Sequence, residues 1–425
     1  MAISRRQFLT AGAALGIAGF MLKPDDKGLP HNRYFSKLNE QLRNHGDFVP
    51  TMLIDLDKVD ANITQLKTIM NSNTDLRIVA KSVPSPQLLD YLLKNTNTNK
   101  LMLFHQPFLS HIAEHYPHSD VLLGKPMPVK AAENFYHQLS SETTFNPKQQ
   151  LQWLIDSELR LQQYLALAKS LNQHCKINIE IDVGLHRGGL QHPKQLDPLN
   201  KIIATNPKHL SFAGFMGYDP HIVKIPSIVK SPQQAYEESQ TIYKSFINRL
   251  YELNPEYKNQ KLCFNGAGSP SILMHKDKTV ANELAAGSCF VKPTDFDIPS
   301  LTTFAPAAYI ATPILKKIQG VQLPAIEFAK EIIPLWDPNT QRTYFIYGGK
   351  WLAKYESPKG LQANPLFGTS TNQEIVNGSI NTKLDVDDHI FLRPTQSEAV
   401  FLQFDGLVTL RNKKIDQKWS ILSQS

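Results

Sequence analysis

The chain has 425 residues, of which 41% are hydrophobic and 20% charged, and its formal net charge at pH 7 is +7. This composition is typical of a folded globular protein and excludes a disordered chain, and the length allows one large barrel with a smaller domain, or two to three ordinary domains. The basic residues are scattered, whereas a nucleic-acid-binding protein gathers them along one stripe, so we expect no nucleic-acid partner. The three cysteines, Cys175, Cys263 and Cys289, lie far apart, which argues against a disulfide framework or a cysteine-based zinc site.

Residues 1–22 are predicted to be an export signal. Two adjacent arginines, Arg5 and Arg6, precede an apolar run from Ala11 to Leu22 that is too short to span a bilayer of about 30 Å as a helix. The arginine pair resembles a twin-arginine signal, which predicts a periplasmic protein. An ordinary secretory signal, or retention of the segment as a loose membrane anchor, remains open. Residues 23–49 would then be a linker or N-terminal extension, and no integral membrane domain is expected.

From residue 50 onward, short apolar runs typical of buried strands alternate with stretches that have helical spacing. The first run is Met52–Leu56, and the stretch from Val59 to Met70 has helical spacing. The later strand candidates are Leu76–Ala80, Leu101–Phe104, Val121–Leu123, Leu151–Ile155, Ile177–Val183, Leu210–Met216, Leu262–Phe264 and Cys289–Val291. The helix candidates between them include Pro86–Leu93, Val129–Leu139, Glu158–Leu171, Gln195–Ala204 and Gln233–Leu253.

Roughly eight strand–helix units in about 250 residues match the size of a (β/α)8 barrel of the TIM type. An open doubly wound sheet has the same local pattern, but distinctive polar residues follow several different strands, as the catalytic face of a barrel requires. We therefore predict an α/β fold with a barrel over residues 50–305. Beyond it, short strands predict a smaller β-rich C-terminal domain over residues 306–425. Its strand candidates are Tyr344–Tyr347, His389–Leu392, Val400–Phe404 and Val408–Leu410.

Lys81 ends the apolar run that begins at Arg77. In the low-dielectric mouth of a barrel the ammonium form of a lysine is disfavoured, and the free amine becomes a nucleophile able to form a Schiff base. A lysine that simply reaches solvent is the alternative interpretation.

Two glycine-containing segments follow later strands. In the first, His186 and Arg187 stand in a loop closed by Gly188 and Gly189, and the arginine can donate to oxygen or ring-nitrogen acceptors. The second is 265–269, which consists of Asn265, Gly266, Ala267, Gly268 and Ser269, and whose main-chain N–H groups and serine hydroxyl are typical of a phosphate site. It is neither a dinucleotide fingerprint nor a P-loop. A structural turn remains the alternative for each segment.

Taken together and in order, these segments resemble the D-threonine aldolase / D-serine dehydratase branch of the alanine-racemase-like enzymes, which are fold type III pyridoxal-phosphate proteins. The resemblance runs from about Pro50 to Phe404. It rests on the opening strand and helix at 51–63, Ala80-Lys81-Ser82, Ile181–Gly189, Gly214–Tyr218, Asn265–Ser269 and Glu283–Ser288.

The resemblance implies that pyridoxal 5′-phosphate lies at the carboxyl end of the barrel. Lys81 would hold it as an internal aldimine and act as the catalytic base, and Arg187 and Tyr218 would lie beside its ring. The implied cofactor-binding set is Lys81, His186, Arg187, Tyr218, Asn265, Gly266, Ala267, Gly268 and Ser269. The expected substrate is a small-molecule D-amino acid, the reaction that of a lyase, and the assembly a homodimer.

Three departures from the family pattern affect this prediction. Ser82-Val83-Pro84 replaces Thr-His-Lys, and Tyr347-Gly348-Gly349 stands where Asp-Ala-Gly is expected. The branch also carries a Pro-x-His-x-Cys metal pair, whereas the chain has Gln396 and Glu398 at those two positions. Glutamine is a poor zinc ligand, so we predict no metal-ligating residues and regard a divalent metal as doubtful. This counts against aldol cleavage and β-elimination, because the family's metal binds the substrate hydroxyl.

Three other functions stay open from the sequence. An amino-acid racemase of the same fold needs two opposed bases and no metal, although no second base is evident. A pyridoxal-phosphate-binding protein with degenerate chemistry would suit the altered metal pair. A zinc hydrolase is suggested by the His-x-x-Glu-His spacing of His111, Glu114 and His115, for which an exposed helix with incidental histidines is the simpler explanation.

Overall fold

The computed structural model describes residues 23–321, 329–364 and 366–423, so the predicted export signal lies outside the described residues. The chain forms two compact units. Within the described residues, we call them the barrel unit, from residues 54–308, 396–407 and 418–423, and the sheet unit, from residues 23–53, 309–321, 329–364, 366–395 and 408–417. The units are not continuous in sequence, in contrast to the predicted boundaries at 50–305 and 306–425.

The barrel unit contains a closed barrel of eight parallel strands in the order β2-β3-β4-β5-β6-β7-β8-β9. This confirms the predicted TIM-type barrel. The strands are β2 (Asp75–Val79), β3 (Lys100–Leu103), β4 (Asp120–Leu123), β5 (Leu151–Ile155), β6 (Cys175–Glu180), β7 (Leu210–Gly217), β8 (Cys263–Gly266) and β9 (Glu283–Ala286). All five side chains of β5 are buried, four of them apolar, and the fifth, Gln152, accepts a hydrogen bond from Asn178 inside the barrel.

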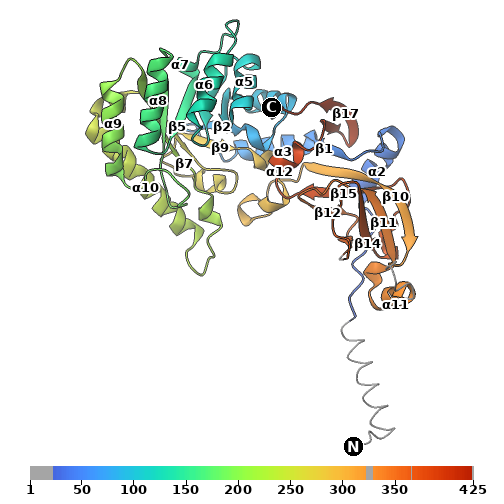
Figure 1. Cartoon of the computed structure of the whole chain (residues 1–425). Coiled ribbons are helices and arrows are strands. Elements are labelled where there is room, and N and C mark those ends of the chain that lie inside the picture. Colours follow the sequence, from blue (N-terminus) through green and yellow to red (C-terminus); the bar gives the residue numbers. More distant parts are fainter. Residues whose placement is uncertain (1–22, 322–328, 365, 424–425) are drawn as a thin grey trace, which may run out of the picture. The chain divides into compact units, whose positions relative to one another are not determined.

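Helices cover the outside of the barrel, as Figure 1 shows for α5, α6, α8, α9 and α10. The helices of this unit are α3 (Leu56–Lys67), α4 (Pro86–Thr96), α5 (Gln106–His115), α6 (Val129–Gln138), α7 (Pro147–Gln150), α8 (Glu158–Ser170), α9 (Leu196–Thr205), α10 (Pro232–Leu253) and α12 (Ser397–Phe401). Short 3-10 turns include η1 (Ala80–Ser82), η3 (Pro220–Val223), η6 (Ser288–Phe290) and η7 (Thr294–Phe296).

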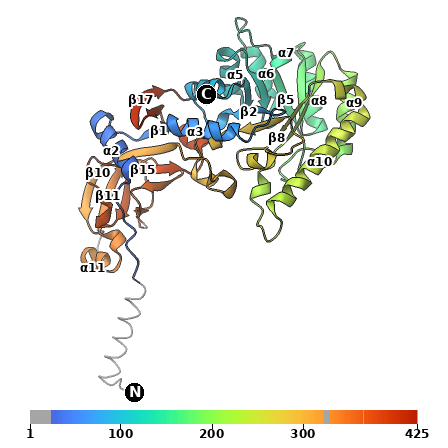
Figure 2. The same ribbon diagram turned by 180° about the vertical axis from the view of Figure 1, so that it is seen from behind.

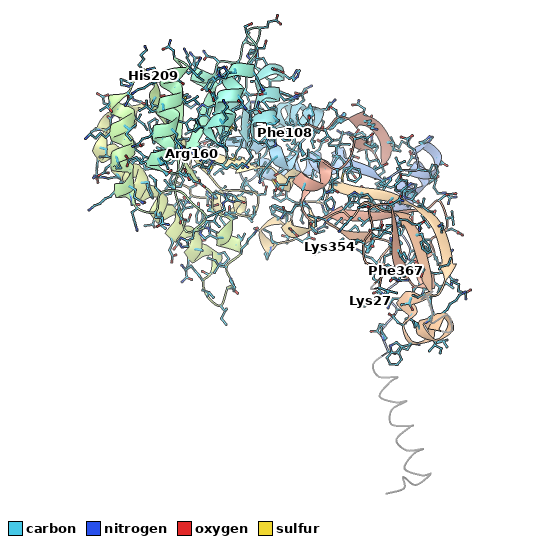
Figure 3. All side chains as sticks on the ribbon, viewed as in Figure 1. Lys27, Phe108, Arg160, His209, Lys354 and Phe367 are labelled. Carbon is cyan, nitrogen blue, oxygen red and sulfur yellow. The ribbon has the colours of Figure 1, made fainter. Side chains whose placement is uncertain are left out.

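Capping residues and first-turn prolines explain where several of these helices begin. Ser231 caps α10 through a capping box with Gln234, and proline occupies its first turn. Ser157 caps α8 with a single hydrogen bond from the Arg160 N–H. The apolar faces then pack inward: Phe108 of α5, labelled in Figure 3, is buried, whereas Arg160 of α8, also labelled there, is only half-buried.

The sheet unit is built on a nine-stranded sheet whose main path is β13-β14-β11-β10-β1-β16-β17, with β15 pairing β10 and β12. Its strands are β1 (Thr51–Asp55), β10 (Ala308–Gln319), β11 (Arg342–Tyr347), β12 (Ala353–Ser357), β13 (Gln362–Ala363), β14 (Gln373–Gly378), β15 (His389–Pro394), β16 (Leu407–Arg411) and β17 (Lys414–Trp419). The helices of this unit are α2 (Arg33–His45) and α11 (Ala329–Trp336). Figure 2 shows the sheet from behind, with α2 beside it.

The segment predicted as a linker or N-terminal extension, residues 23–49, is part of the sheet unit. Asn32 caps the helix α2. Phe35 of this helix packs against two rings of the sheet unit, with centroid distances of 5.1 Å to Tyr309 and 4.9 Å to Phe391. The Arg43 guanidinium lies 3.0 Å from Asp388. Even Lys27, labelled in Figure 3, donates its main-chain N–H to Asn339. An amphipathic helix with a buried face cannot act as a free linker, so residues 23–49 are a structural extension.

Three predicted strands differ from the structure. Met52–Leu56 does not open the barrel: β1 joins the nine-stranded sheet. Cys289–Val291 forms η6 and its end rather than a strand, and the last barrel strand is β9, just before it. Val400 lies in α12, whose apolar residues share one buried face of a short helix instead of alternating as in a strand. None of the helices within the described ranges has the length and apolar character needed to cross a bilayer.

Candidate active site

A cavity of about 220 Å³ opens at the carboxyl ends of the barrel strands. Its walls come from the ends of seven strands or the turns that follow them, and from α12, all within the barrel unit. This is the face on which TIM barrels carry their active sites, because eight strand-to-helix loops converge there. The cavity therefore defines the candidate site.

Lys81 lies in this cavity, on η1 immediately after β2. Its Nζ atom is 3.0 Å from Glu398 Oε2 and 4.6 Å from the centroid of the Phe104 ring. The side chain is 39% exposed, so a small molecule entering the cavity can reach the amine. The sequence predicted that this amine would lie isolated in an apolar mouth. In the structure it is instead paired with a carboxylate.

The loop after β8 lines the same cavity. Ala267, Gly268 and Ser269 line it, and Ala267 has a positive φ of 63°, which turns the backbone sharply. Ser269 Oγ accepts hydrogen bonds from the N–H groups of Gly287 and Cys289 at 3.2 and 3.1 Å. Gly268 has to be glycine, because a Cβ atom there would lie 2.4 Å from the Tyr218 ring. A turn of small residues with main-chain N–H groups and a serine hydroxyl suits a phosphate group.

Tyr218 adjoins this loop and, with Arg187, forms the next part of the wall. The Arg187 guanidinium carbon lies 4.8 Å from the centroid of the Tyr218 ring. Burial raises the pKa of Tyr218, and the positive charge of Arg187 opposes that rise only in part. The phenol is therefore protonated at neutral pH and can donate a hydrogen bond or a proton.

The turn that presents Arg187 is held by Asp182, which the sequence did not single out. Its Oδ1 accepts the N–H groups of Gly184 and His186, each at 2.9 Å. His186 Nδ1 lies 2.9 Å from Asp182 Oδ2, and its side chain is 82% exposed. His186 does not line the cavity, so it acts in the turn and does not reach the site.

Two further predicted residues sit differently from expectation. Gly266 belongs to β8 and is buried against Ala281, outside the cavity lining. Asn265 does line the cavity, but its amide donates to Glu283 Oε1 at 3.0 Å, deeper in the barrel. The remaining predicted residues all line the cavity: Lys81, Arg187, Tyr218, Ala267, Gly268 and Ser269.

The segment that replaces the family's metal pair also reaches the cavity. Gln396 Nε2 donates to Asp295 Oδ2 at 3.2 Å, and Glu398 pairs with Lys81. No group of three or more histidine, cysteine or acidic side chains suited to a metal occurs within the described part of the chain. The rings of His111 and His115 do lie 4.3 Å apart on α5, but among the described residues no third such group joins them.

Several lining residues were missed from the sequence, among them Phe104, Gly124, Lys224 and Asp295. Phe104 ends a predicted strand, which is a usable indication in a barrel. Lys224 and Asp295 lie in the 3-10 turns or directly after them, where the sequence has no distinctive pattern.

The family model described as alanine racemase, N-terminal domain, matches residues 54–294. The chain belongs to this family. The predicted resemblance to alanine-racemase-like enzymes is thereby confirmed. A search of curated proteins found no match.

Solved structures resemble the whole fold at low sequence identity. D-threonine aldolase from Filomicrobium marinum has a TM-score of 0.67 at 14% identity, covering 88% of this chain and 96% of that one. D-threo-3-hydroxyaspartate dehydratase from Delftia sp. HT23 has a TM-score of 0.64 at 14% identity, covering 88% and 97%. Alanine racemase from Clostridium difficile 630 has a TM-score of 0.62 at 15% identity, covering 89% and 100%. These similarities establish the shared fold.

Proposed function

We propose that this member of the alanine racemase family is a pyridoxal-phosphate-dependent enzyme that acts on D-amino acids. The observation that carries the proposal is the position of Lys81 and of the 267–269 loop on one cavity at the carboxyl end of the barrel. An amine and an anion-binding loop on one small cavity match a ligand that carries both an aldehyde and a phosphate group.

The residues present fit pyridoxal phosphate. The main-chain turn at Ala267–Ser269, with the serine hydroxyl, would hold its phosphate, since such turns bind anions. Arg187 would donate to the oxygen or nitrogen acceptors of its ring, and Lys81 would bond to its aldehyde carbon. Bound there, the cofactor supplies an electron sink for a carbanion at the substrate Cα.

The chain's own groups would then control proton movement. Lys81 Nζ can take a proton from Cα or return one, and the Tyr218 phenol, whose pKa burial raises, carries a proton of its own at neutral pH. The cavity is bounded by Phe104, Met102 and Met216, which limit the access of water. The small volume favours amino acids with short side chains.

Within this class we propose a lyase of the D-threonine aldolase / D-serine dehydratase type, as two of the structural neighbours are named for such reactions. Racemisation is the second candidate. Lys81 and Tyr218 both line the cavity, and two proton-carrying groups are what a two-base racemisation needs. This observation favours the racemase more than the sequence alone did.

The assembly and location are proposals from the resemblance and from residues 1–22. We propose a homodimer, tested by the mass of the purified protein in solution. We also propose export to the periplasm by the twin-arginine route. A fusion of residues 1–30 to a folded reporter should reach the periplasm, and replacement of Arg5 and Arg6 by lysine should retain it in the cytoplasm.

The function is tested by spectroscopy and product analysis on the purified full chain. The wild type should bind one pyridoxal phosphate per chain, and borohydride reduction should fix the cofactor to Lys81 in mass spectra. D-serine should yield pyruvate and ammonia, or D-threonine glycine and acetaldehyde, whereas a racemase would give the L-enantiomer of its substrate. A wild type that takes up no added cofactor contradicts the proposal, and a protein that binds the cofactor but turns over no amino acid leaves a binding role.

A further inference from the structure

One side of the cavity is built to hold a positive charge. Glu398 places a carboxylate oxygen 3.0 Å from Lys81 Nζ, and the Phe104 ring faces the same nitrogen at 4.6 Å. A carboxylate and an aromatic face around one nitrogen recognise a primary ammonium group by charge and by the ring quadrupole together. Neither residue belongs to the cofactor-binding set implied by the family.

The Phe104 ring is fixed by its surroundings. Gly124 at the end of β4 leaves room for it, since a Cβ atom there would lie 2.4 Å from two ring carbons. Both residues line the cavity. The ring position is therefore a property of the barrel itself and does not depend on where Lys81 points.

Glu398 is fixed as well. It lies in the first turn of α12, where its neighbours Ser397, Val400 and Phe401 are buried. The segment begins at Gln396, which donates to Asp295 Oδ2. The backbone at Glu398 is thus held by a packed helix, and its carboxylate is within reach of the cavity.

We propose that Phe104 and Glu398 form an ammonium-binding subsite. In the cofactor-free protein the Lys81 ammonium fills this subsite, and the amino group of the substrate occupies it when Lys81 has left. The identity of the incoming ligand rests on the proposed function, whereas the subsite itself does not. A D-amino acid brings one primary ammonium and one carboxylate to this cavity.

The other charges of the cavity support this orientation. Arg187 and Lys224 add two cations to the wall, and the acid Asp295 is engaged by Gln396. The two cations repel an ammonium and attract a carboxylate. The charges of Arg187 and Glu398 both shift the pKa of Tyr218, so both are close enough to act on a ligand in the same cavity. The substrate ammonium would therefore go to Glu398 and its carboxylate toward Arg187 and Lys224.

The test removes Lys81 and offers a free ammonium in its place. The probe is ethylammonium, titrated by calorimetry into the full-length Lys81→Ala variant without cofactor. Saturable binding in the millimolar range is expected, at least about tenfold tighter than to the wild type, where Lys81 competes. Ethanol, which is neutral and similar in size, should not bind measurably.

Second substitutions locate the subsite. Lys81→Ala/Glu398→Gln should bind ethylammonium about tenfold more weakly than Lys81→Ala, and Lys81→Ala/Phe104→Leu about threefold more weakly. Glu398→Ala serves as a second replacement, and unchanged thermal melting shows that each variant is folded. Glu133 is a matched control, because it pairs with Lys130 at 2.7 Å and is 31% exposed against 33% for Glu398. Glu133→Gln should change nothing.

The outcomes separate this inference from the proposed function. Absence of saturable binding to Lys81→Ala, or binding that survives loss of Glu398, overturns the subsite. Failure of the wild type to take up pyridoxal phosphate overturns the proposed function and does not affect the titration.

Discussion

Two of the lysine–glutamate pairs in the barrel unit lie at opposite ends of its strands. At the carboxyl end Lys81 Nζ lies 3.0 Å from Glu398, and at the amino end Lys100 Nζ lies 2.8 Å from Glu283. The distances are nearly equal, but Glu398 is 33% exposed and Glu283 only 1%. The same chemical pair thus occurs once beside a cavity and once inside the barrel.

The Glu283 carboxylate has several further partners inside the barrel, so none of its oxygens is open to a ligand. Arg77, fully buried on β2, donates Nη2 to Glu283 Oε2 at 2.9 Å and also binds Asp120 at 2.8 Å. Asn265 adds a hydrogen bond to the same carboxylate. A buried charge network of this kind fixes the packing of strands, whereas a pair at a cavity can exchange one partner for a ligand. Burial and neighbours, and not the residue types, decide which role the pair has.

The largest expected effect separates the two lysines by function. Lys81→Ala should lower activity by about 10³-fold or more and abolish the cofactor absorbance, since both the covalent bond and the base are lost. Its free energy of unfolding should change by less than about 1 kcal/mol, because the pair it breaks is half-exposed. Absorbance titration measures the bound cofactor, product assays measure the activity, and urea unfolding measures the free energy of unfolding. Lys81→Ala protein with full covalent loading would contradict the assignment.

Next in size is the effect of removing the buried acid. Glu283→Gln should lower the free energy of unfolding by about 3–5 kcal/mol, because the fully buried Arg77 loses one of its two carboxylate partners. Glu398→Gln is the matched variant and should cost less than about 1 kcal/mol. Urea unfolding of both proteins checks the contrast, and equal losses would refute the distinction between the two ends.

Acid should act on the amino end of the barrel. Burial alone would raise the pKa of Glu283, but Arg77 and Lys100 outweigh it and hold the pKa at about 2, below the usual 4.5. A depressed carboxyl pKa stabilises the fold above the unfolded value, and this stability is lost as pH falls from about 4.5 through about 2. The loss should reach about 3 kcal/mol. Unfolding followed between pH 6 and pH 2 should lack this slope in Glu283→Gln, while Glu398→Gln keeps it.

The smallest effect concerns substrate affinity at the carboxyl end. Glu398→Gln should raise KM about tenfold and lower kcat less, because it removes an ammonium contact made before the chemical step. Steady-state kinetics with the best D-amino acid measure the two constants separately. A fall in kcat with unchanged KM would mean that Glu398 acts in the chemical step instead.

Local sequence pattern by itself determined much of the fold. The apolar strands of the barrel follow from hydrophobic periodicity, and Lys81, Arg187 and the 267–269 loop could be singled out because each follows a strand. Tyr218 was added only by the family resemblance. Strand ends meet at one face of a barrel, so order along the chain is enough to predict that such residues converge.

Only the tertiary structure decided how distant segments combine. The strand β1 and the helix α2 join a sheet made mostly of residues beyond 308, and α12 returns to the barrel to place Glu398 beside Lys81. Such pairings join residues more than 250 positions apart and leave no local periodicity. Likewise His186 and Arg187 are adjacent in sequence, yet the turn held by Asp182 directs only Arg187 into the cavity. The direction of a side chain depends on hydrogen bonds and packing that arise only when the chain has folded.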